Sequence, residues 1–246
     1  MDPLLLYVLA VVFVATLIRS ALGFGEALVA VPLLALRLPI GVAAPLAVLV
    51  SITVAAVVVA QDWRHVQLRS AAGLVLATLA GIPLGLWLLT RVDARVVKAG
   101  LALVILAFAL YSLLHRRPPQ LARDHAGWLV GCGFCAGVLG GAYGMNGPPL
   151  VVYGSLRRWS PAHFRATLQA YFLPASIIGM AGYWLAGLWS AAVTGYFVRS
   201  LPAIVVAILA GRVLNRRIDS HAFVRWVHGA LVATGVALLV QALGAA

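Results

Sequence analysis

Residues 140–149 read GGAYGMNGPP, and this stretch decides how the surrounding chain folds. It lies inside an apolar segment that runs from Ala126 to Leu156. Glycine frees the backbone and proline has no N–H to donate, so the stretch cannot continue a regular helix. A shorter interruption, GFGE at residues 23–26, breaks an earlier apolar segment from Leu4 to Leu36. Paired breaks at matching places in two halves of a membrane protein are typical of a transporter's binding site.

The composition predicts an all-α integral membrane protein. Of the 246 residues, 63% are hydrophobic and only 10% are charged, whereas a soluble globular domain carries about 25% charged residues. The net charge of +12 does not indicate a nucleic-acid partner, because the basic residues lie mostly between apolar runs and do not interleave with aromatic residues. They are interpreted as topology signals and as contacts to anionic lipid, which makes the lipid bilayer an expected partner.

A helix needs about 20 apolar residues to cross a bilayer, and by that measure the chain has eight segments. The two broken segments are Leu4–Leu36 and Ala126–Leu156, and the others are Gly41–Ala60, Ser70–Thr90, Val96–Leu114, Phe164–Ala186, Trp189–Gly211 and His221–Val240. The linkers are short and basic, so none can form a soluble domain.

An internal repeat is visible in the sequence. The pattern G-x-x-L-x-x-R, followed by Val-Asp or Ile-Asp, occurs at residues 85–93 and again at 211–219, 126 positions later. Closer to the breaks the offset is about 122, which pairs Gly25 with Gly147 and Pro39 with Pro161. These matches predict two homologous four-segment repeats, 1–116 and 117–246, within one membrane domain.

The distribution of basic residues leaves two topologies open. If all eight segments cross, with both chain ends outside, the inner loops hold eleven Lys and Arg residues and the outer loops five. If the broken segments enter and return on the same side, the split is twelve to four. The positive-inside rule is compatible with both topologies. We favour eight crossings, which implies parallel repeats. The alternative, with broken segments that return, implies inverted repeats.

The second break predicts an anion site. Asn146 or Gly147 can cap a short helix whose first turn holds Pro148 and Pro149, where no N–H partner is needed. Its free N–H groups and positive dipole end then point into the interruption, a geometry that binds anions. A second helix start at Glu26, next to Gly25, is expected to face the same cavity. The alternative is that both breaks are kinks needed only for packing.

Glu26 and Arg199 are charged candidates inside apolar segments, which also contain Arg19. Glu26 is a candidate proton carrier, because an ionisable group inside the membrane costs free energy and usually has a function. The alternatives are a helix-cap partner or a salt bridge to Arg19. Arg199 lies about nine residues into its segment and is expected to face the bundle interior. Its planar guanidinium suits an oxyanion, although pairing with Glu26 is also open.

Further candidates are polar groups near the second break. Arg165 and Gln169 share one helix face and are candidates to draw in the anion, with an interfacial anchor as the alternative for Arg165. Tyr143 is a candidate donor to a sulfonate, although buried tyrosines commonly serve packing. Cys132 and Cys135 form a single C-x2-C without further ligands, so we expect packing residues and neither a metal site nor a cofactor.

Two other features are assigned no chemistry. Glycines at every fourth position, 133, 137 and 141, form a smooth face that lets helices approach closely, as does the pair Gly81 and Gly85. The chain has no H-E-x-x-H or G-x-S-x-G motif and no pair of carboxylates inside an apolar segment. The sequence therefore does not predict an enzyme.

The residues around both breaks resemble the TauE/SafE family of sulfite and organosulfonate exporters. The resemblance rests on Gly23-Phe24-Gly25 followed by Val31-Pro32-Leu33-Leu34, and on Gly147-Pro148-Pro149-Leu150, and it extends over essentially the whole chain. It implies a multi-pass permease of the bacterial inner membrane, without enzymatic activity, for small anions that often contain sulfur. The chain departs from the family pattern at Glu26, where the family usually continues with glycine.

Together these observations predict a permease that exports small anions such as sulfite, thiosulfate or sulfoacetate, with possible proton coupling through Glu26. The site is expected to contain Gly25, Glu26, Asn146, Gly147 and Arg199. Two other functions stay open, a membrane scaffold subunit that does not transport and a passive anion channel. Besides the substrate anion, a second copy of the chain is an optional partner in a homodimer.

Overall fold

The computed structural model describes the chain except residues 1, 63–67, 115–124, 158–160, 216–219 and 245–246. Within the described residues the protein consists of ten α-helices and contains no strand. The helices are α1 (Pro3–Leu22), α2 (Glu26–Ala35), α3 (Ile40–Asp62), α4 (Leu68–Arg91), α5 (Ala94–Leu114), α6 (Ala126–Tyr143), α7 (Gly147–Leu156), α8 (Pro161–Leu185), α9 (Ala191–Asn215) and α10 (Ser220–Leu243). The predicted all-α architecture is confirmed.

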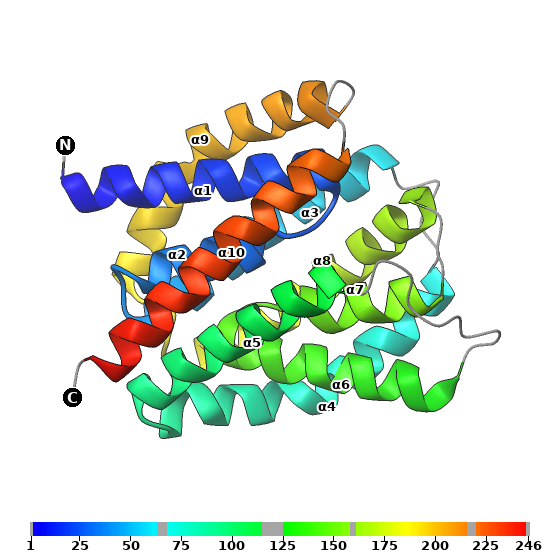
Figure 1. Ribbon diagram of the computed structural model, residues 1–246, viewed down its shortest axis with the longest axis horizontal. Helices are drawn as coiled ribbons and strands as arrows, with labels where there is room; N and C mark the ends of the chain where they lie inside the picture. Colours follow the sequence, from blue (N-terminus) through cyan, green and yellow to red (C-terminus); the bar gives the residue numbers. More distant parts are fainter. Residues whose placement is uncertain (1, 63–67, 115–124, 158–160, 216–219, 245–246) are drawn as a thin grey trace.

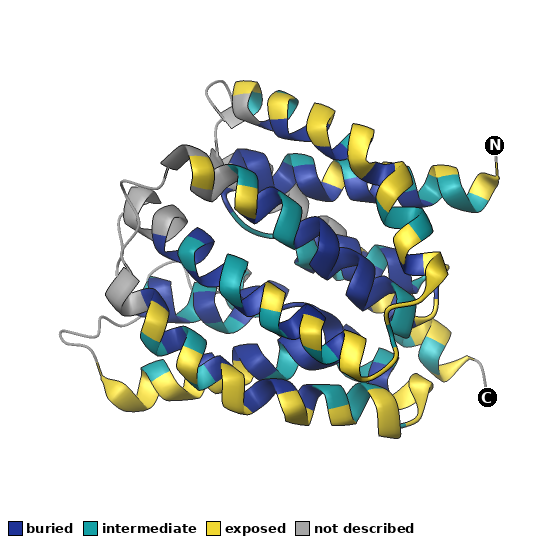
Figure 2. Ribbon diagram, turned by 180° about the vertical axis from the view of Figure 1, so that it is seen from behind, coloured by how far each residue is buried: buried dark blue, intermediate teal, exposed yellow. Residues whose placement is uncertain are grey.

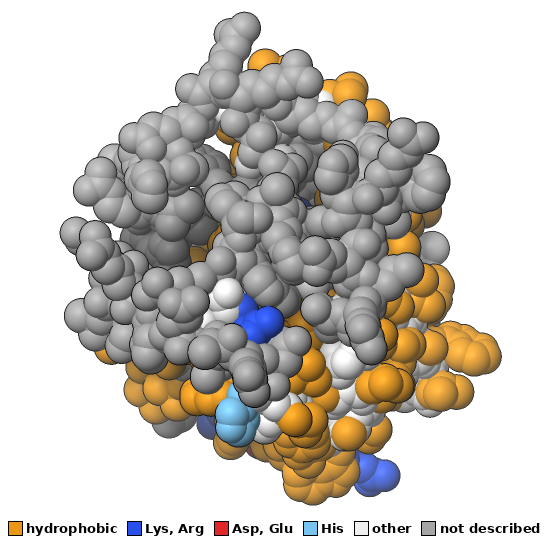
Figure 3. All heavy atoms as spheres, turned by 90° about the vertical axis from the view of Figure 1, so that its right-hand side faces the viewer, with side chains coloured by type: hydrophobic (Ala, Val, Ile, Leu, Met, Phe, Trp, Pro, Cys, Tyr) orange, Lys and Arg blue, Asp and Glu red, His pale blue; other side chains and the backbone are white. Residues whose placement is uncertain are grey.

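The helices have the surface of a membrane protein. Among the described residues, six contain a stretch long and apolar enough to cross a bilayer, namely α1, α3, α4, α5, α6 and α9. Their inward faces are buried and their outward faces are exposed (Figure 2). Large apolar side chains such as Leu76 and Trp87 are exposed, and most of the side chains coloured by type in Figure 3 are hydrophobic. Such a surface is stable only when it faces lipid.

The first break folds the chain back on itself. Gly23, with φ 87°, ends α1, and Gly25, with φ 94°, precedes α2; this left-handed conformation is open to glycine at little steric cost. Helix α2 then returns alongside α1, because the Tyr7 hydroxyl near the start of α1 donates to the carbonyl of Leu33 near the end of α2, at 2.5 Å. The broken segment therefore starts and ends at the same end of the bundle (Figure 1).

This arrangement corrects the favoured topology. Helix α7 likewise packs on α6 and runs back towards the end where α6 begins, and α1 and α6 run in opposite directions (Figure 1). The preference for broken segments that cross once, and for parallel repeats, is wrong. The length of the broken segments could not decide between one crossing and a return to the same side. A segment of about 33 residues is too long for one span of about 20 residues and too short for two. That the halves are homologous stays a prediction.

The orientation follows from the basic residues. Both chain ends and the helix ends that carry Arg37, Arg91, Arg95 and Lys98 lie on one side of the bundle (Figure 1). The helix ends that flank residues 63–67, 115–124, 158–160 and 216–219 lie on the opposite side, and most of the remaining basic residues are in or next to those linkers in the sequence. By the positive-inside rule, we expect that second side to be cytoplasmic.

Close helix pairs hold the bundle together. Helix α6 lies along α4 and α1 lies along α9, while α3 and α8 pack against each other, as do α5 and α10. A side chain at Gly137 would overlap the backbone of α4 at Thr78, and one at Gly85 would overlap the backbone of α6 at Val138. The predicted packing role of these glycine faces is confirmed. The same pairs bring the two breaks together between α3 and α8.

Candidate functional site

The two helix breaks line one cavity. Its walls comprise residues 24–28 from the first break, residues 144–147 from the second, and Arg19, Ser51 and Phe172. Four of the predicted site residues are therefore brought together: Gly25, Glu26, Asn146 and Gly147. The cavity has a volume of about 20 Å³, which is room for about one water molecule. The site is closed in this conformation.

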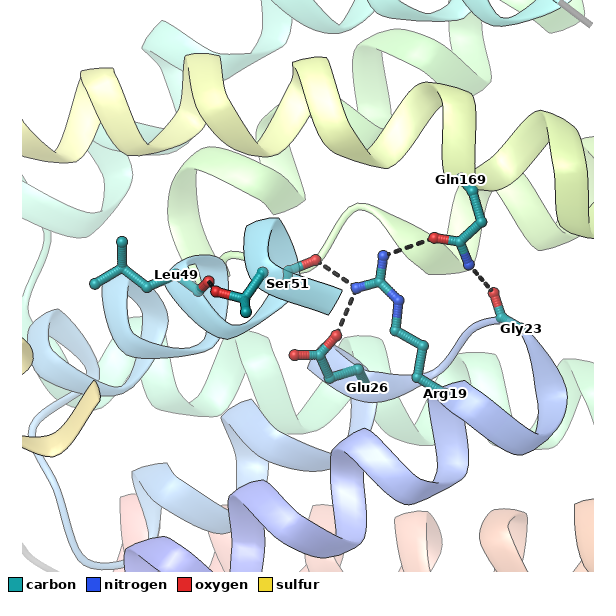
Figure 4. Close-up of polar contacts among 7 residues, drawn as sticks. Arg19, Gly23, Glu26, Leu49, Ser51 and Gln169 are labelled. Atoms are coloured by element: carbon teal, nitrogen blue, oxygen red, sulfur yellow. Dashed lines mark hydrogen bonds and ion pairs between the residues drawn. The ribbon is translucent and has the colours of Figure 1, made fainter. Parts of the chain in front are cut away.

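Arg19 is the cation of this site. It lies one turn before the end of α1, and only 3% of the residue is exposed. One terminal nitrogen donates to Glu26 Oε2 at 2.5 Å and to Ser51 Oγ at 2.6 Å, and the other donates to Gln169 Oε1 at 2.9 Å (Figure 4). The guanidinium also lies over the ring of Phe172, 5.1 Å from its centroid. Arg19 thus joins α1, α2, α3 and α8.

The ion pair settles one alternative for Glu26. Glu26 is the first residue of α2 and is 2% exposed, and its partner is Arg19, as one of the sequence alternatives foresaw. Arg19 itself was missing from the predicted anion ligands. Its position inside an apolar segment was the signal that could have placed it there, because ionisable groups at that depth are costly.

Gln169 connects the ion pair to the first break. While its carbonyl oxygen accepts from Arg19, its Nε2 donates to the backbone oxygen of Gly23 at 2.8 Å. Both ends of the amide are used, so the side chain has one fixed orientation. Gln169 fastens α8 to the end of α1.

Two buried polar atoms of the site have no hydrogen-bond partner, Arg19 Nε and Glu26 Oε1. Leaving such atoms unpaired costs about 1–3 kcal/mol each, more when the group is charged. Most buried polar atoms in proteins are paired, and these two belong to charged groups that line the cavity.

The two helix starts at the cavity differ in their backbone donors. The first three N–H groups of α2, from Glu26 to Leu28, have no partner within the helix. In α7 the corresponding positions are Gly147, Pro148 and Pro149, and the prolines have no N–H. Helix α2 therefore offers more backbone donors at the cavity than α7 does, and whether either helix start binds the anion stays a prediction.

At the second break the polar contacts are neutral. Asn146 Nδ2 donates to the Tyr171 hydroxyl at 3.4 Å, and this hydroxyl lies 2.7 Å from Thr78 Oγ1. Thr78 in turn donates to the carbonyl of Gly133 at 3.0 Å. This chain of hydrogen bonds fixes Asn146 against α4, α6 and α8.

Arg199 does not belong to the site. Its side chain is exposed on α9, it does not line the cavity, and Glu26 pairs with Arg19. The prediction that Arg199 faces the bundle interior is wrong. The buried face of α9 is set by Val193, Ser200 and Ile204, and a residue next to Ser200 is turned by about 100° from it.

The remaining candidates lie elsewhere. Tyr143 is buried, but its hydroxyl approaches Gly100 of α5 and it does not line the cavity. The side chain of Arg165 lies outside the described residues. Cys132 is buried and Cys135 is exposed, both as free thiols. Within the described part of the chain, no cluster of three His, Cys, Asp or Glu residues is arranged to hold a metal ion.

Comparisons with known proteins identify relatives over most of the chain. A family model described as sulfite exporter TauE/SafE matches residues 8–238. The chain is 26% identical over 211 residues to a protein of Cupriavidus necator named probable sulfite/organosulfonate exporter TauE, covering 84% of this chain and 82% of the relative. It is 28% identical over 180 residues to a protein of Comamonas testosteroni named probable inner membrane transporter protein TsaS, covering 72% and 74% of the two chains. No solved structure matches.

Proposed function

The chain belongs to the TauE/SafE family of sulfite exporters, and we propose that it exports a small sulfur oxyanion or organosulfonate, which binds at Arg19 between the two helix breaks. The family and the relatives establish the broader function: it is a multi-pass transporter of the bacterial inner membrane and not an enzyme. The observation that carries the finer proposal is the buried Arg19 beside the start of α2, at the cavity lined by both breaks.

The hydrogen-bond donors of Arg19 and of the start of α2 suit an oxyanion. A guanidinium presents several donors in a plane, which matches the spacing of oxygens on a sulfite or sulfonate group. Its Nε is unpaired, and the backbone donors of α2 add the positive end of a helix dipole. An anion here replaces the hydration that it loses by hydrogen bonds from fixed donors.

Glu26 holds the place of the anion in the closed state. Its carboxylate accepts a hydrogen bond from Arg19, as a substrate oxygen would. The cavity of about 20 Å³ cannot hold a sulfite ion in addition to the Glu26 carboxylate, since a single water takes up most of it. Substrate entry therefore requires Glu26 to release Arg19 and the helices around the breaks to separate. Rocking of one half of the bundle against the other provides this movement in broken-helix carriers.

This exchange couples the anion to a proton. When the substrate takes Arg19, the Glu26 carboxylate loses its counter-ion while buried, and binding a proton removes that uncompensated charge. One anion and one proton then occupy the site together, and both leave when the Arg19–Glu26 pair forms again. A gradient of either species drives the other, so export by this route is driven by an outward gradient of the anion and carries protons out with it.

The test is flux into proteoliposomes that contain the purified protein, with sulfite, thiosulfate or sulfoacetate, with and without a pH gradient. We expect saturable flux of at least one of them, faster when the gradient favours movement of protons with the anion. Saturation without any response to the gradient would remove the coupling and leave the carrier. Flux that rises linearly with concentration would indicate a passive channel, and no flux from folded protein would contradict this choice of substrates.

A further inference from the structure

The helices form two groups that meet at the anion cavity. In the first group α1 packs on α2 and α9, and α3 packs on α2. In the second group α4 packs on α6 and α8, and α6 packs on α7. Figure 1 shows α1 and α9 in the upper part of the bundle and α4 and α6 in the lower part. The groups touch through α3 and α8, while α5 and α10 pack on each other. Arg19 and Glu26 line the cavity from the first group, and Asn146 and Phe172 line it from the second.

Gln169 crosses the boundary between the two groups. It belongs to α8 of the second group, and both atoms that it binds lie at the end of α1 in the first. Its Oε1 accepts from Nη2 of Arg19 at 2.9 Å, and its Nε2 donates to the carbonyl of Gly23 at 2.8 Å. Gln169 is buried and does not line the anion cavity. A hydrogen bond from a charged donor is roughly twice as strong as a neutral one, so the bond to Arg19 opposes separation of the groups at this point.

The unused hydrogen-bond donors of Arg19 decide where an oxyanion binds it. Glu26 and Ser51 both accept from Nη1, so the hydrogens of that nitrogen are used. Nε has no partner. In a guanidinium, Nε and Nη2 point parallel N–H groups to one side, the arrangement that binds an oxyanion through two oxygens. In Figure 4 Gln169 reaches Nη2 from the side opposite Glu26 and Ser51. The amide oxygen of Gln169 therefore takes one of the positions that such an anion needs.

We propose that Gln169 is a latch between the two groups, which an oxyanion opens when it takes Nη2 of Arg19. This inference rests on the proposed function, in which the substrate binds Arg19 in place of Glu26. The anion accepts hydrogen bonds from Nε and Nη2 and displaces the amide oxygen of Gln169. The amide then keeps its neutral bond to the carbonyl of Gly23, and the groups separate more easily around the cavity. Gln169 is thus a positioning residue, which acts through Arg19 and keeps the empty site closed.

The latch responds to the shape of the anion. A sulfonate or sulfite offers separate oxygens to parallel N–H groups, whereas chloride is a single acceptor. Chloride can bind to the unpaired Nε of Arg19 and leave Gln169 on Nη2. We therefore expect oxyanions to open the site and chloride to leave it closed.

Gln241 on α10 offers a matched control. Its Oε1 accepts from Lys98 at 3.4 Å, and its Nε2 donates to the carbonyl of Leu36, after the end of α2, at 3.2 Å. It joins a cation to a helix end as Gln169 does, but it is exposed and does not line the anion cavity. Methionine is a flexible, unbranched side chain without the amide, so Gln169→Met removes the latch and Gln241→Met removes the control contact. Thermal unfolding checks that each variant is folded.

The experiment measures the distance between the groups by pulsed electron paramagnetic resonance, on protein in lipid nanodiscs. Spin labels are attached at Leu76→Cys on α4 and Val206→Cys on α9, which are exposed positions, after Cys132→Ala and Cys135→Ala have removed the native thiols. In this parent protein we expect a single distance when the site is empty. Sulfoacetate should add a second distance, and chloride should not.

The matched variants are compared in the same labelled background. Gln169→Met should populate the second distance without any anion, because the empty site is no longer held closed. Gln241→Met should behave like the parent protein.

The affinity for sulfoacetate separates a latch from an ordinary structural contact. Gln169→Met should bind sulfoacetate about tenfold more tightly, because more of the empty protein is already competent to bind. This change is equivalent to about 1.4 kcal/mol. Loss of a merely structural contact would instead weaken binding. Isothermal titration calorimetry on the unlabelled proteins measures the affinity, and Gln241→Met should match the wild type.

Failure of the latch and failure of the proposed function give different results. A folded Gln169→Met protein that keeps the single distance when empty overturns the latch, whichever anion the protein carries. Opening by chloride as well as by sulfoacetate also overturns it, and this comparison needs only the parent protein. A parent protein that neither binds sulfoacetate nor responds to it contradicts the proposed substrate, while the empty Gln169→Met protein still decides whether the latch exists.

Discussion

Both helix breaks end the preceding helix in the same way and then differ in chemistry. Gly23 and Gly144 adopt left-handed conformations after α1 and α6, and each donates its N–H four residues back, to Arg19 and to Gly140 respectively. Where the first break has Arg19, the second has a glycine. A side chain built at Gly140 would lie 2.5 Å from Asn146 Nδ2, so Asn146 occupies that space.

The two breaks therefore have the same backbone geometry after the preceding helix, but only the first break has a charged side chain at the corresponding position. The first break concentrates an ion pair and most of the free N–H donors, whereas the second offers a neutral amide in a chain of hydrogen bonds. A single cation is enough to bind a single anion, and a second buried charge would add another desolvation penalty. We therefore expect variants of the first break to change transport, and variants of the second to change stability.

The largest effect is expected from Arg19→Gln. Removing the guanidinium takes away the charged hydrogen bonds to the substrate, each worth about 1.5–3 kcal/mol, so initial flux should fall by at least about tenfold. The single variant also leaves Glu26 buried without a counter-ion, which destabilises by about 3–5 kcal/mol. Arg19→Gln with Glu26→Gln removes both charges, and should unfold closer to the wild type while staying inactive. Normal flux from this folded double variant would exclude Arg19 as the anion ligand.

Glu26→Gln tests the coupling within the same break. A glutamine can still accept from Arg19 but cannot exchange a proton, so anion exchange should continue while its response to a pH gradient disappears. The measurement compares exchange of labelled substrate with net flux driven by the gradient, on the same vesicles. A response that survives the substitution places the proton elsewhere in the protein.

At the second break, Gly140→Ala should act on stability. The added methyl group meets the Asn146 amide at 2.5 Å, and overpacking of a buried site costs about 1–3 kcal/mol. Gly131→Ala is the matched control, because the same change there meets open space. Unfolding by heat in detergent, followed by loss of soluble protein, measures the difference. Equal stability of the two variants would show that Asn146 can move without cost.

Tyr171→Phe removes one hydroxyl from the neutral chain. Thr78 keeps its bond to the carbonyl of Gly133, while Asn146 Nδ2 loses its acceptor. The expected loss is therefore about 1–3 kcal/mol, with little change in flux. The same unfolding assay detects it. A loss of transport larger than the loss of folded protein would instead give Asn146 and Tyr171 a direct part in anion binding.

The sequence predicted the all-α architecture and the presence of two breaks, because both depend on local properties. Glycine and proline place the interruptions within residues 23–26 and 140–149, and the structure leaves only residues 23–25 and 144–146 outside the helices. Gly25, Glu26, Asn146 and Gly147 line one cavity, as expected if the breaks face each other. The role of each residue in binding stays a prediction.

Direction and helix phase were not predicted. Two left-handed glycines and the Tyr7–Leu33 hydrogen bond decide whether the chain continues across the membrane after α1 or turns back. That hydrogen bond joins residues far apart in the sequence. The choice between Arg19 and Arg199 depended on which face each helix buries. In a membrane helix with apolar residues all round, the pattern of hydrophobic residues does not mark that face.

The smallest effect is therefore expected from Arg199→Gln, and it is informative because the sequence ranked this residue with the site. Arg199 and Arg19 both lie inside apolar segments, but Arg199 is exposed on α9 while Arg19 is buried against Glu26. Helical side chains lean towards the N-terminus of their helix, which for α9 is the outer side of the membrane. Gly195 and Ala192, one and two turns before Arg199, are small, so the guanidinium can extend along this face to the outer headgroups. Flux from Arg199→Gln should match the wild type within about twofold, a change of about 0.4 kcal/mol. A loss as large as that of Arg19→Gln, from protein inserted at the normal level, would show that the anion meets a second arginine outside the cavity between the breaks.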